Sequence, residues 1–144
     1  MEAQLAVASD HAGRRLKKAV KDHLLAAGLS VFDFGVSDEA DKVDYPDYAF
    51  PLAESLAAGR FAAGILVCGS GLGMAIAANR VRGVRAASCA NEFLARMARA
   101  HNNANILTLG ERVVGEGLAL AMVDVFLATP FEGGRHQARL DKIP

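Results

Sequence analysis

The chain has 144 residues and a mass of 15.1 kDa, which suffices for one compact domain with a buried core. Sixteen Lys and Arg residues balance sixteen Asp and Glu residues, so the protein lacks the surplus positive charge of a non-specific nucleic-acid-binding protein. Hydrophobic residues make up 52% of the chain, which excludes a disordered protein. No apolar run reaches the ~18 residues of a membrane-spanning helix. We therefore expect a soluble protein with neither nucleic-acid nor membrane partners.

The cysteine content indicates the compartment. Two cysteines, Cys68 and Cys89, are too few for a disulfide-stabilised scaffold and suit a reducing environment. The first residues show no pattern typical of a secretory signal. We therefore expect a cytoplasmic location.

Short apolar runs alternate with amphipathic stretches along the chain. In chain order, the sequence predicts a strand at 5–8, a helix at 11–28, a strand at 31–34, a helix at 46–58, a strand at 64–67, a helix at 74–80, a strand at 84–88, a helix at 92–100, a strand at 106–109 and a helix at 117–127. Alternation of apolar strands with helices is typical of a parallel sheet that is covered on both faces. We predict a five-stranded parallel sheet in an α/β/α sandwich, Rossmann-like or flavodoxin-like.

Residues 129–144 do not fit the alternation, and we interpret them as a C-terminal arm. Because the chain has no linker, repeat or low-complexity tract, we expect residues 1–144 to form a single domain that includes this arm. Charge is unevenly distributed: residues 33–54 hold seven acidic side chains and one Lys, whereas residues 80–101 hold five Arg and one Glu. This pattern fits two solvated surfaces, or attraction between subunits.

Reactive side chains gather just after the predicted strands, which is where parallel α/β proteins bind ligands. In chain order these residues are Asp10, His11, Asp44, Tyr45, Cys68, Glu111 and Arg112. One cluster is different, because His101 and Asn102 end the fourth predicted helix. The convergence of the others predicts a ligand site at one edge of the sheet.

A glycine-rich loop directly follows Cys68. Gly69, Gly71 and Gly73 allow the backbone to approach a ligand closely and to offer amide groups to an anion, although a tight turn alone also requires glycine. The spacing fits neither the dinucleotide fingerprint nor the Walker motif. A thiolate at Cys68 would be stabilised by these amides and could act as a nucleophile or a general base. The alternative is a small buried residue, which is what we expect of Cys89.

Histidine and arginine side chains supply further candidates. His11, His101 and His136 are suited to acid–base chemistry or phosphate contact. Arg135 and Arg139 would share one face of a helical arm, where they could clamp a phosphate or form a solvated basic tail. The Cys and His residues match no metal-binding spacing, so we expect no metal.

Six sequence blocks together resemble the type B ribose-5-phosphate isomerases, a family that also includes the galactose-6-phosphate isomerase subunits. The blocks are ASDHAG at 8–13, DYP at 44–46, CGSGLGMAIAAN at 68–79, HNNAN at 101–105, GERVV at 110–114 and FEGGRH at 131–136. They occur in order across nearly the whole chain. The resemblance implies interconversion of ribose 5-phosphate and ribulose 5-phosphate through a cis-enediolate, without a metal or organic cofactor.

The resemblance also implies individual roles. Cys68 would be the base that moves the proton, and Ser70 with the amides of Gly69, Gly71 and Gly73 would stabilise the enediolate. His101, with Asp10 nearby, would assist ring opening. The remaining implied contacts are Tyr45 and Asn102 to sugar hydroxyls, His11, Arg112, Arg135 and Arg139 to the phosphate, and His136 close to it.

Two further features follow from the resemblance. Some relatives lack the cysteine and carry a glutamate directly after the last loop glycine; here that position is Met74, which implies the cysteine-type mechanism. Relatives are homodimers, often paired into tetramers, and they share active sites between subunits. We therefore expect a homodimer or a dimer of dimers, with the arm at 129–144 as the means of sharing.

Several alternatives stay open. The same residues could act on allose 6-phosphate, galactose 6-phosphate or a tetrose phosphate. The chain could also be a flavodoxin-like module that binds a phosphosugar without chemistry, or a structural subunit of a two-chain isomerase.

Overall fold

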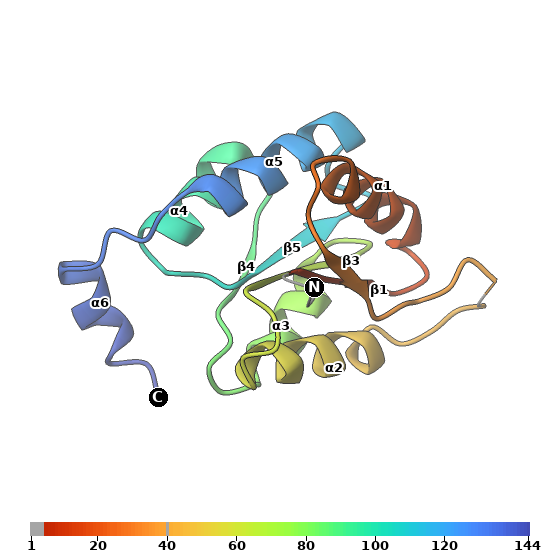
Figure 1. Ribbon diagram of the computed structural model, residues 1–144. Coiled ribbons are helices and arrows are strands. Elements are labelled where there is room, and N and C mark those ends of the chain that lie inside the picture. The colour runs from red at the N-terminus through yellow and green to blue at the C-terminus, as the bar shows by residue number, and fades with distance from the viewer. Residues whose placement is uncertain (1–4, 40) are drawn as a thin grey trace.

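The computed structural model describes residues 5–39 and 41–144 (Figure 1). In chain order its elements are β1 (Leu5–Ser9), α1 (Arg14–Ala26), β2 (Val31–Asp33), α2 (Pro46–Ala57), β3 (Ala63–Cys68), α3 (Leu72–Ala78), β4 (Ala86–Ser88), α4 (Glu92–Ala100), β5 (Ile106–Gly110), α5 (Glu116–Ala128) and α6 (Arg135–Leu140). Within these described ranges, no helix has the length and apolar character needed to cross a bilayer. Each predicted strand and helix is present.

The five strands form one parallel sheet in the order β2-β1-β3-β5-β4, which confirms the predicted sheet. Strand β1 has β2 on one side and β3 on the other, so the direction in which the chain adds strands reverses at β1. Such a reversal of direction leaves a crevice outside the carboxyl ends of the two strands on either side of it, here β1 and β3. Cys68, the last residue of β3, is paired with Gly110, the last residue of β5. The ends of β1, β3 and β5 are therefore adjacent.

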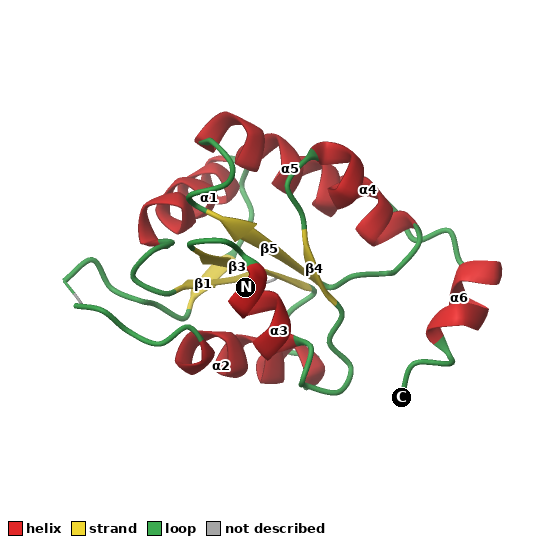
Figure 2. Ribbon diagram, turned by 180° about the vertical axis from the view of Figure 1, so that it is seen from behind, coloured by secondary structure: helices red, strands yellow, loops and turns green. Residues whose placement is uncertain are grey.

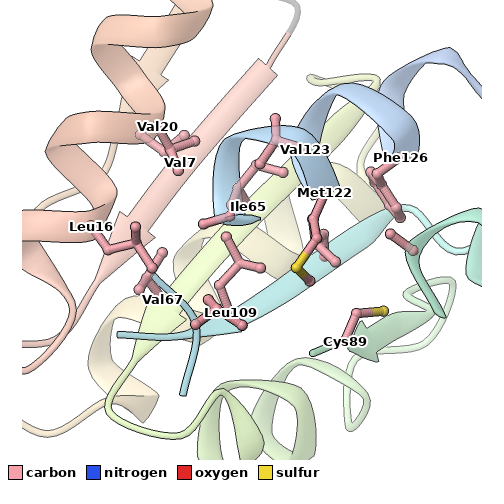
Figure 3. Packing of buried hydrophobic residues seen from close by; sticks show 14 of the residues in the cluster. Val7, Leu16, Val20, Ile65, Val67, Cys89, Leu109, Met122, Val123 and Phe126 are labelled. Carbon is pink, nitrogen blue, oxygen red and sulfur yellow. The ribbon is translucent and has the colours of Figure 1, made fainter. Parts of the chain in front are cut away.

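Two helical layers cover the sheet, with α1, α4 and α5 on one face and α2 and α3 on the other (Figures 1 and 2). Successive strand side chains point to opposite faces. Ile65 and Val67 of β3 thus pack toward α1 and α5, as Figure 3 shows, whereas Leu66 and Cys68 pack toward α2 and α3. Cys89 belongs to the first of these two cores, so the two cysteines lie in different cores.

Some element boundaries differ from the predictions, each for a local reason. Helix α1 begins at Arg14 rather than His11, because Asp10 Oδ1 accepts the N–H groups of Ala12 and Gly13 and closes a turn there. Helix α3 begins at Leu72, so that Gly73 lies inside its first turn. Strand β4 is shorter than predicted and begins at Ala86.

The C-terminal arm contains α6 and stands apart from the three layers, beyond the end of α4 (Figures 1 and 2). The Glu132 N–H donates a hydrogen bond to the Ala100 carbonyl at 3.0 Å, which attaches the start of the arm to the end of α4. The helix that follows is six residues long, shorter than an isolated helix needs to be stable in water. Its order therefore depends on packing.

A largely buried ion pair joins β2 to α1. The Lys17 side chain is only 6% exposed, and its Nζ lies 3.0 Å from Asp33 Oδ1. Lys21 Nζ lies 3.2 Å from Asp33 Oδ2. Burial raises the pKa of Asp33, but the Gly35 N–H and the two lysines together outweigh burial and hold this pKa below its usual value.

We expect Asp33→Ala to lower the free energy of unfolding by about 3 kcal/mol, because a buried ammonium loses its partner. Since the pKa of Asp33 is lower in the folded state, its stabilisation is present above pH ~4 and is lost as the pH falls through the folded pKa. Chemical denaturation at several pH values measures both effects. Asp22→Ala is the matched control, because its pair with Lys18 is exposed, and it should leave stability nearly unchanged. Equal losses of unfolding free energy in Asp33→Ala and Asp22→Ala would contradict a special role for the buried pair of Asp33 and Lys17.

Candidate active site

Most of the residues predicted to follow strands meet at the carboxyl edge of the sheet; among the described residues, no contact of the Asp44 side chain places it there. We call this group the strand-end cluster; it comprises Asp10, His11, Tyr45, Cys68, Gly69, Ser70, Gly71, Gly73 and Arg112. It combines a thiol, a carboxylate, an imidazole and a guanidinium around a glycine loop. This is a site with both acid–base and anion-binding groups.

The Cys68 thiol is held against the glycine loop. Cys68 is 4% exposed, and its Sγ accepts a hydrogen bond from the Gly71 N–H at 3.1 Å. Gly71 has a φ of 81°, a conformation that glycine adopts readily. The buried Thr108 hydroxyl of β5 donates to the Gly71 carbonyl at 2.8 Å and fixes the loop from the neighbouring strand. A backbone donor is thus fixed directly beside the sulfur.

Two glycines permit close approaches that define the shape of the loop. A Cβ on Gly110 would lie 2.6 Å from the backbone carbonyl carbon of Ser70, so β5 and the loop touch through their backbones. A Cβ on Gly73 would lie 2.8 Å from the Tyr45 ring, which therefore packs directly on the first turn of α3. Ser70 is exposed, and its Oγ accepts the Leu72 N–H at 3.2 Å. The Tyr45 ring and the Ser70 hydroxyl thus both contact this turn.

We expect Gly110→Ala to lower the free energy of unfolding by about 1–3 kcal/mol, because the new methyl group must displace the backbone at Ser70. Gly117→Ala is the matched control. A Cβ on Gly117, within α5, would meet nothing within 4 Å, and we expect a gain of up to about 1 kcal/mol from higher helix propensity. Thermal denaturation of both variants tests this, and a neutral Gly110→Ala would show that the loop is not tightly packed.

The rest of the cluster is attached to the same loop. His11 Nδ1 lies 3.1 Å from both the backbone N and O of Val43, so the imidazole is fixed to the acidic loop before α2. The Arg112 N–H donates to the Gly69 carbonyl at 3.1 Å. The Arg112 guanidinium lies over Gly69, with Nη1 3.5 Å from the position of an added Cβ. The Arg112 guanidinium is exposed and able to meet an anion.

Three further residues support the cluster: Glu111, which is predicted to lie just after a strand, and Thr108 and Gly110 of β5. Glu111 Oε1 accepts the Leu16 N–H at 2.7 Å, and the Glu111 N–H donates to the Cys68 carbonyl at 2.9 Å, so one residue links α1 to the thiol strand. The expected position just after a strand is the sequence signal for Glu111, and both Glu111 and Gly110 stand in the GERVV block. The roles of Thr108 and Gly110 depend on strand register, for which the sequence has no signal.

A second group gathers around the end of α4 and the arm. We call it the arm cluster; it comprises His101, Asn102, Glu132, Arg135, His136 and Arg139. The His101 and His136 rings are stacked, with centroids 4.1 Å apart and planes 12° apart. Beside them lies a cavity of about 240 Å³, lined by His101, Asn102, His136, Arg139, Leu140 and Ile143. Arg135 and Arg139 are both exposed and lie four residues apart in α6, as helical spacing predicts.

The charges around His136 favour its neutral form. Burial lowers the pKa of His136, and the positive charges of His101, Arg135 and Arg139 lower it further, while Glu132 opposes them. Glu132 Oε1 lies 3.6 Å from His136 Nε2, and Glu132 Oε2 lies 3.9 Å from His101 Nε2. One carboxylate therefore faces both imidazoles.

The two clusters lie at opposite edges of the sheet. Helix α4 follows β4 and returns to the amino end of β5, so His101, which caps α4, lies at the amino edge. Asp10 follows β1 at the carboxyl edge. Within one chain, His101 and Asp10 therefore lie at opposite edges of the sheet, and the neighbourhood that the resemblance implies for them stays a prediction for residues of two different subunits.

The comparisons with known proteins agree with this architecture. The family model for "Ribose/Galactose Isomerase" matches residues 5–143. The ribose-5-phosphate isomerase B of Escherichia coli is 42% identical over 140 residues, which cover 97% of this chain and 93% of that protein.

Solved structures give the same result. A ribose 5-phosphate isomerase structure from Thermotoga maritima has a TM-score of 0.95 and 52% identity, and the match covers 99% of this chain and 98% of that one. The ribose-5-phosphate isomerase B of Mycoplasma genitalium, solved with bound ribulose 5-phosphate, has a TM-score of 0.94 and 43% identity over 99% of this chain and 95% of that one. The chain therefore belongs to the ribose/galactose isomerase family.

Proposed function

We propose that this protein interconverts ribose 5-phosphate and ribulose 5-phosphate. The observation that carries the proposal is the nearly buried Cys68 thiol, 3.1 Å from the Gly71 amide in a glycine loop at the carboxyl edge of the sheet. Relatives named ribose-5-phosphate isomerase B, one of them solved with ribulose 5-phosphate, support this choice of substrate.

The proposed chemistry moves protons with no net oxidation. The Cys68 thiolate removes the proton from C2 of the open aldose, and the C–H electrons form the C1–C2 double bond as O1 takes up negative charge. The thiol then returns the proton to C1, and the O2 proton passes to O1, so that O1 becomes the C1 hydroxyl and the carbonyl forms at C2. The Gly71 amide and the Ser70 hydroxyl stabilise the enediolate oxygen. Met74 has a thioether side chain, which does not accept a proton near neutral pH, so its position offers no alternative base.

The remaining residues complete the proposed site. His101 assists ring opening, and Tyr45 and Asn102 hold sugar hydroxyls. The phosphate contacts are His11, Arg112, Arg135 and Arg139, with His136 close by. No metal or organic cofactor enters these steps.

We further propose that a second copy of the chain brings the two clusters together in a homodimer. The strand-end cluster of one subunit would face the arm cluster of its partner, since one chain keeps them at opposite edges of the sheet. The arm, which stands apart from the layers, supports this arrangement. Leu72 and Ile76, apolar side chains beside the glycine loop that are more than half exposed, also support it.

We also propose a cytoplasmic location, which the free state of Cys68 and Cys89 supports.

A substrate panel on the purified wild-type chain tests the function. We expect the highest kcat/KM with ribose 5-phosphate among ribose 5-, allose 6- and galactose 6-phosphates and a tetrose phosphate. Turnover confined to a hexose or tetrose phosphate would move the assignment to that sugar. Binding without turnover of any of them would favour a phosphosugar-binding module or a structural subunit.

A further inference from the structure

Three side chains of the arm cluster are spaced so that they could together hold a metal ion. The ligand atoms of His101, Glu132 and His136 all lie within 4.8 Å of one another. They come from two places in the chain: His101 lies at the end of α4, whereas Glu132 and His136 lie four residues apart in the arm. The expectation of no metal considered only the spacing of Cys and His residues, so it overlooked a set in which Glu132 supplies one ligand and His101 lies far away in the chain.

One of these ligand atoms lacks a partner. His136 has a side chain only 6% exposed, and its Nε2 has no hydrogen-bond partner among the described residues. A buried polar atom is normally satisfied by a hydrogen bond, a water molecule or an ion. Glu132 Oε1 lies 3.6 Å from this nitrogen, so the unpaired atom faces a carboxylate. A cation between the two would satisfy both.

The types of ligand atom favour zinc over magnesium. Two imidazole nitrogens and one carboxylate oxygen are a common ligand set for zinc, which accepts a water molecule at its fourth position. Magnesium prefers oxygen ligands in octahedral geometry and suits this set poorly. The adjoining cavity of about 240 Å³ leaves room for the water.

The geometry requires one ring to move. The His101 and His136 planes are 12° from parallel, so their in-plane lone pairs do not converge on one point. His101 is 38% exposed, whereas the His136 side chain is buried, so His101 is the ring that would turn. Arg135 and Arg139 oppose a cation electrostatically, but both side chains are exposed, so solvent and salt screen their charges, and the Glu132 charge offsets part of their effect.

We infer that His101, Glu132 and His136 form a site for a zinc-class divalent ion. Where the proposed function holds, this site shares His101 and His136 with the phosphosugar site. The ion and the sugar phosphate therefore exclude each other, and zinc acts as a competitive inhibitor rather than as a cofactor.

Equilibrium dialysis of the metal-free wild-type chain with Zn²⁺ tests the site without any assay of activity. We expect about one ion per chain, no comparable binding of Mg²⁺, and a Kd raised about tenfold or more by Glu132→Gln. Glu116→Gln, at an exposed position in the first turn of α5, is the control and should bind as the wild type does. Cys68→Ala should also bind normally, which separates this site from the thiol.

Three results would overturn the site: saturable Zn²⁺ binding that Glu132→Gln leaves intact, saturable Zn²⁺ binding that Cys68→Ala abolishes, or no saturable Zn²⁺ binding at all.

A second measurement concerns inhibition. In wild-type protein that turns over a phosphosugar, Zn²⁺ should raise the apparent KM reversibly, and Glu132→Gln should need about tenfold more metal for the same effect. Because dialysis needs no substrate, it tests the metal site equally well if the proposed function fails.

Discussion

A Cys68→Ala variant is expected to lose about 10²–10⁴-fold in kcat on ribose 5-phosphate, because a general base contributes a factor of this size. KM should change little, since the phosphate and hydroxyl contacts proposed above do not involve the thiol. The measurement is a steady-state assay together with a binding titration of the phosphosugar. Retained activity would remove Cys68 from the mechanism.

Cys89→Ala is the matched control for this variant. Cys89 is also buried, so both substitutions remove one sulfur from a core, but Cys89 belongs to the core on the other face of the sheet. Burial raises the pKa of Cys89 to about 11, which keeps its thiol protonated and unreactive at neutral pH. We expect wild-type kcat in Cys89→Ala. An equal loss in both variants would point to packing rather than to chemistry at Cys68.

Mixing two inactive variants is expected to restore activity if the site is built from two copies. In a random mixture of Cys68→Ala and His101→Asn, half of the dimers carry one chain of each kind, and each such dimer holds one intact site. About one quarter of wild-type activity should therefore return. The variants are co-expressed or exchanged as subunits, and the specific activity is measured.

The control for this experiment pairs Cys68→Ala with Arg112→Ala. Both changes lie in the strand-end cluster, so every site of the mixed dimer carries one of them and no activity should return. Recovery in this control, or none with His101→Asn, would contradict a site shared between the strand-end cluster of one chain and the arm cluster of another.

Most of the fold was predictable from the sequence because the parallel strands are apolar throughout and the helices between them are amphipathic. The order of the strands could not be predicted, since the sequence carries no local signal that places β5 between β3 and β4. Helix boundaries shifted where a side chain or a glycine altered the first turn, as Asp10 does before α1 and Gly71 before α3.

The strand-end cluster was predictable because the carboxyl ends of parallel strands meet at one edge, which gathers Asp10, Cys68 and Arg112. The arrangement of the arm cluster could not be predicted from the sequence. The stacking of His101 on His136 depends on how the arm turns at Ala100 and Glu132, a tertiary contact between residues that are far apart in the chain. The family resemblance implied roles for these residues but did not place them at the opposite edge of the sheet.

The separation of the two cysteines affects how the protein withstands oxidants. A reactive thiolate is converted by peroxide to a sulfenic acid, which a nearby second thiol can capture as a reversible disulfide before irreversible oxidation follows. Cys68 and Cys89 face different cores across the sheet, and they are the only cysteines in the chain. Rescue of an oxidised Cys68 therefore depends on a thiol supplied from outside its own chain.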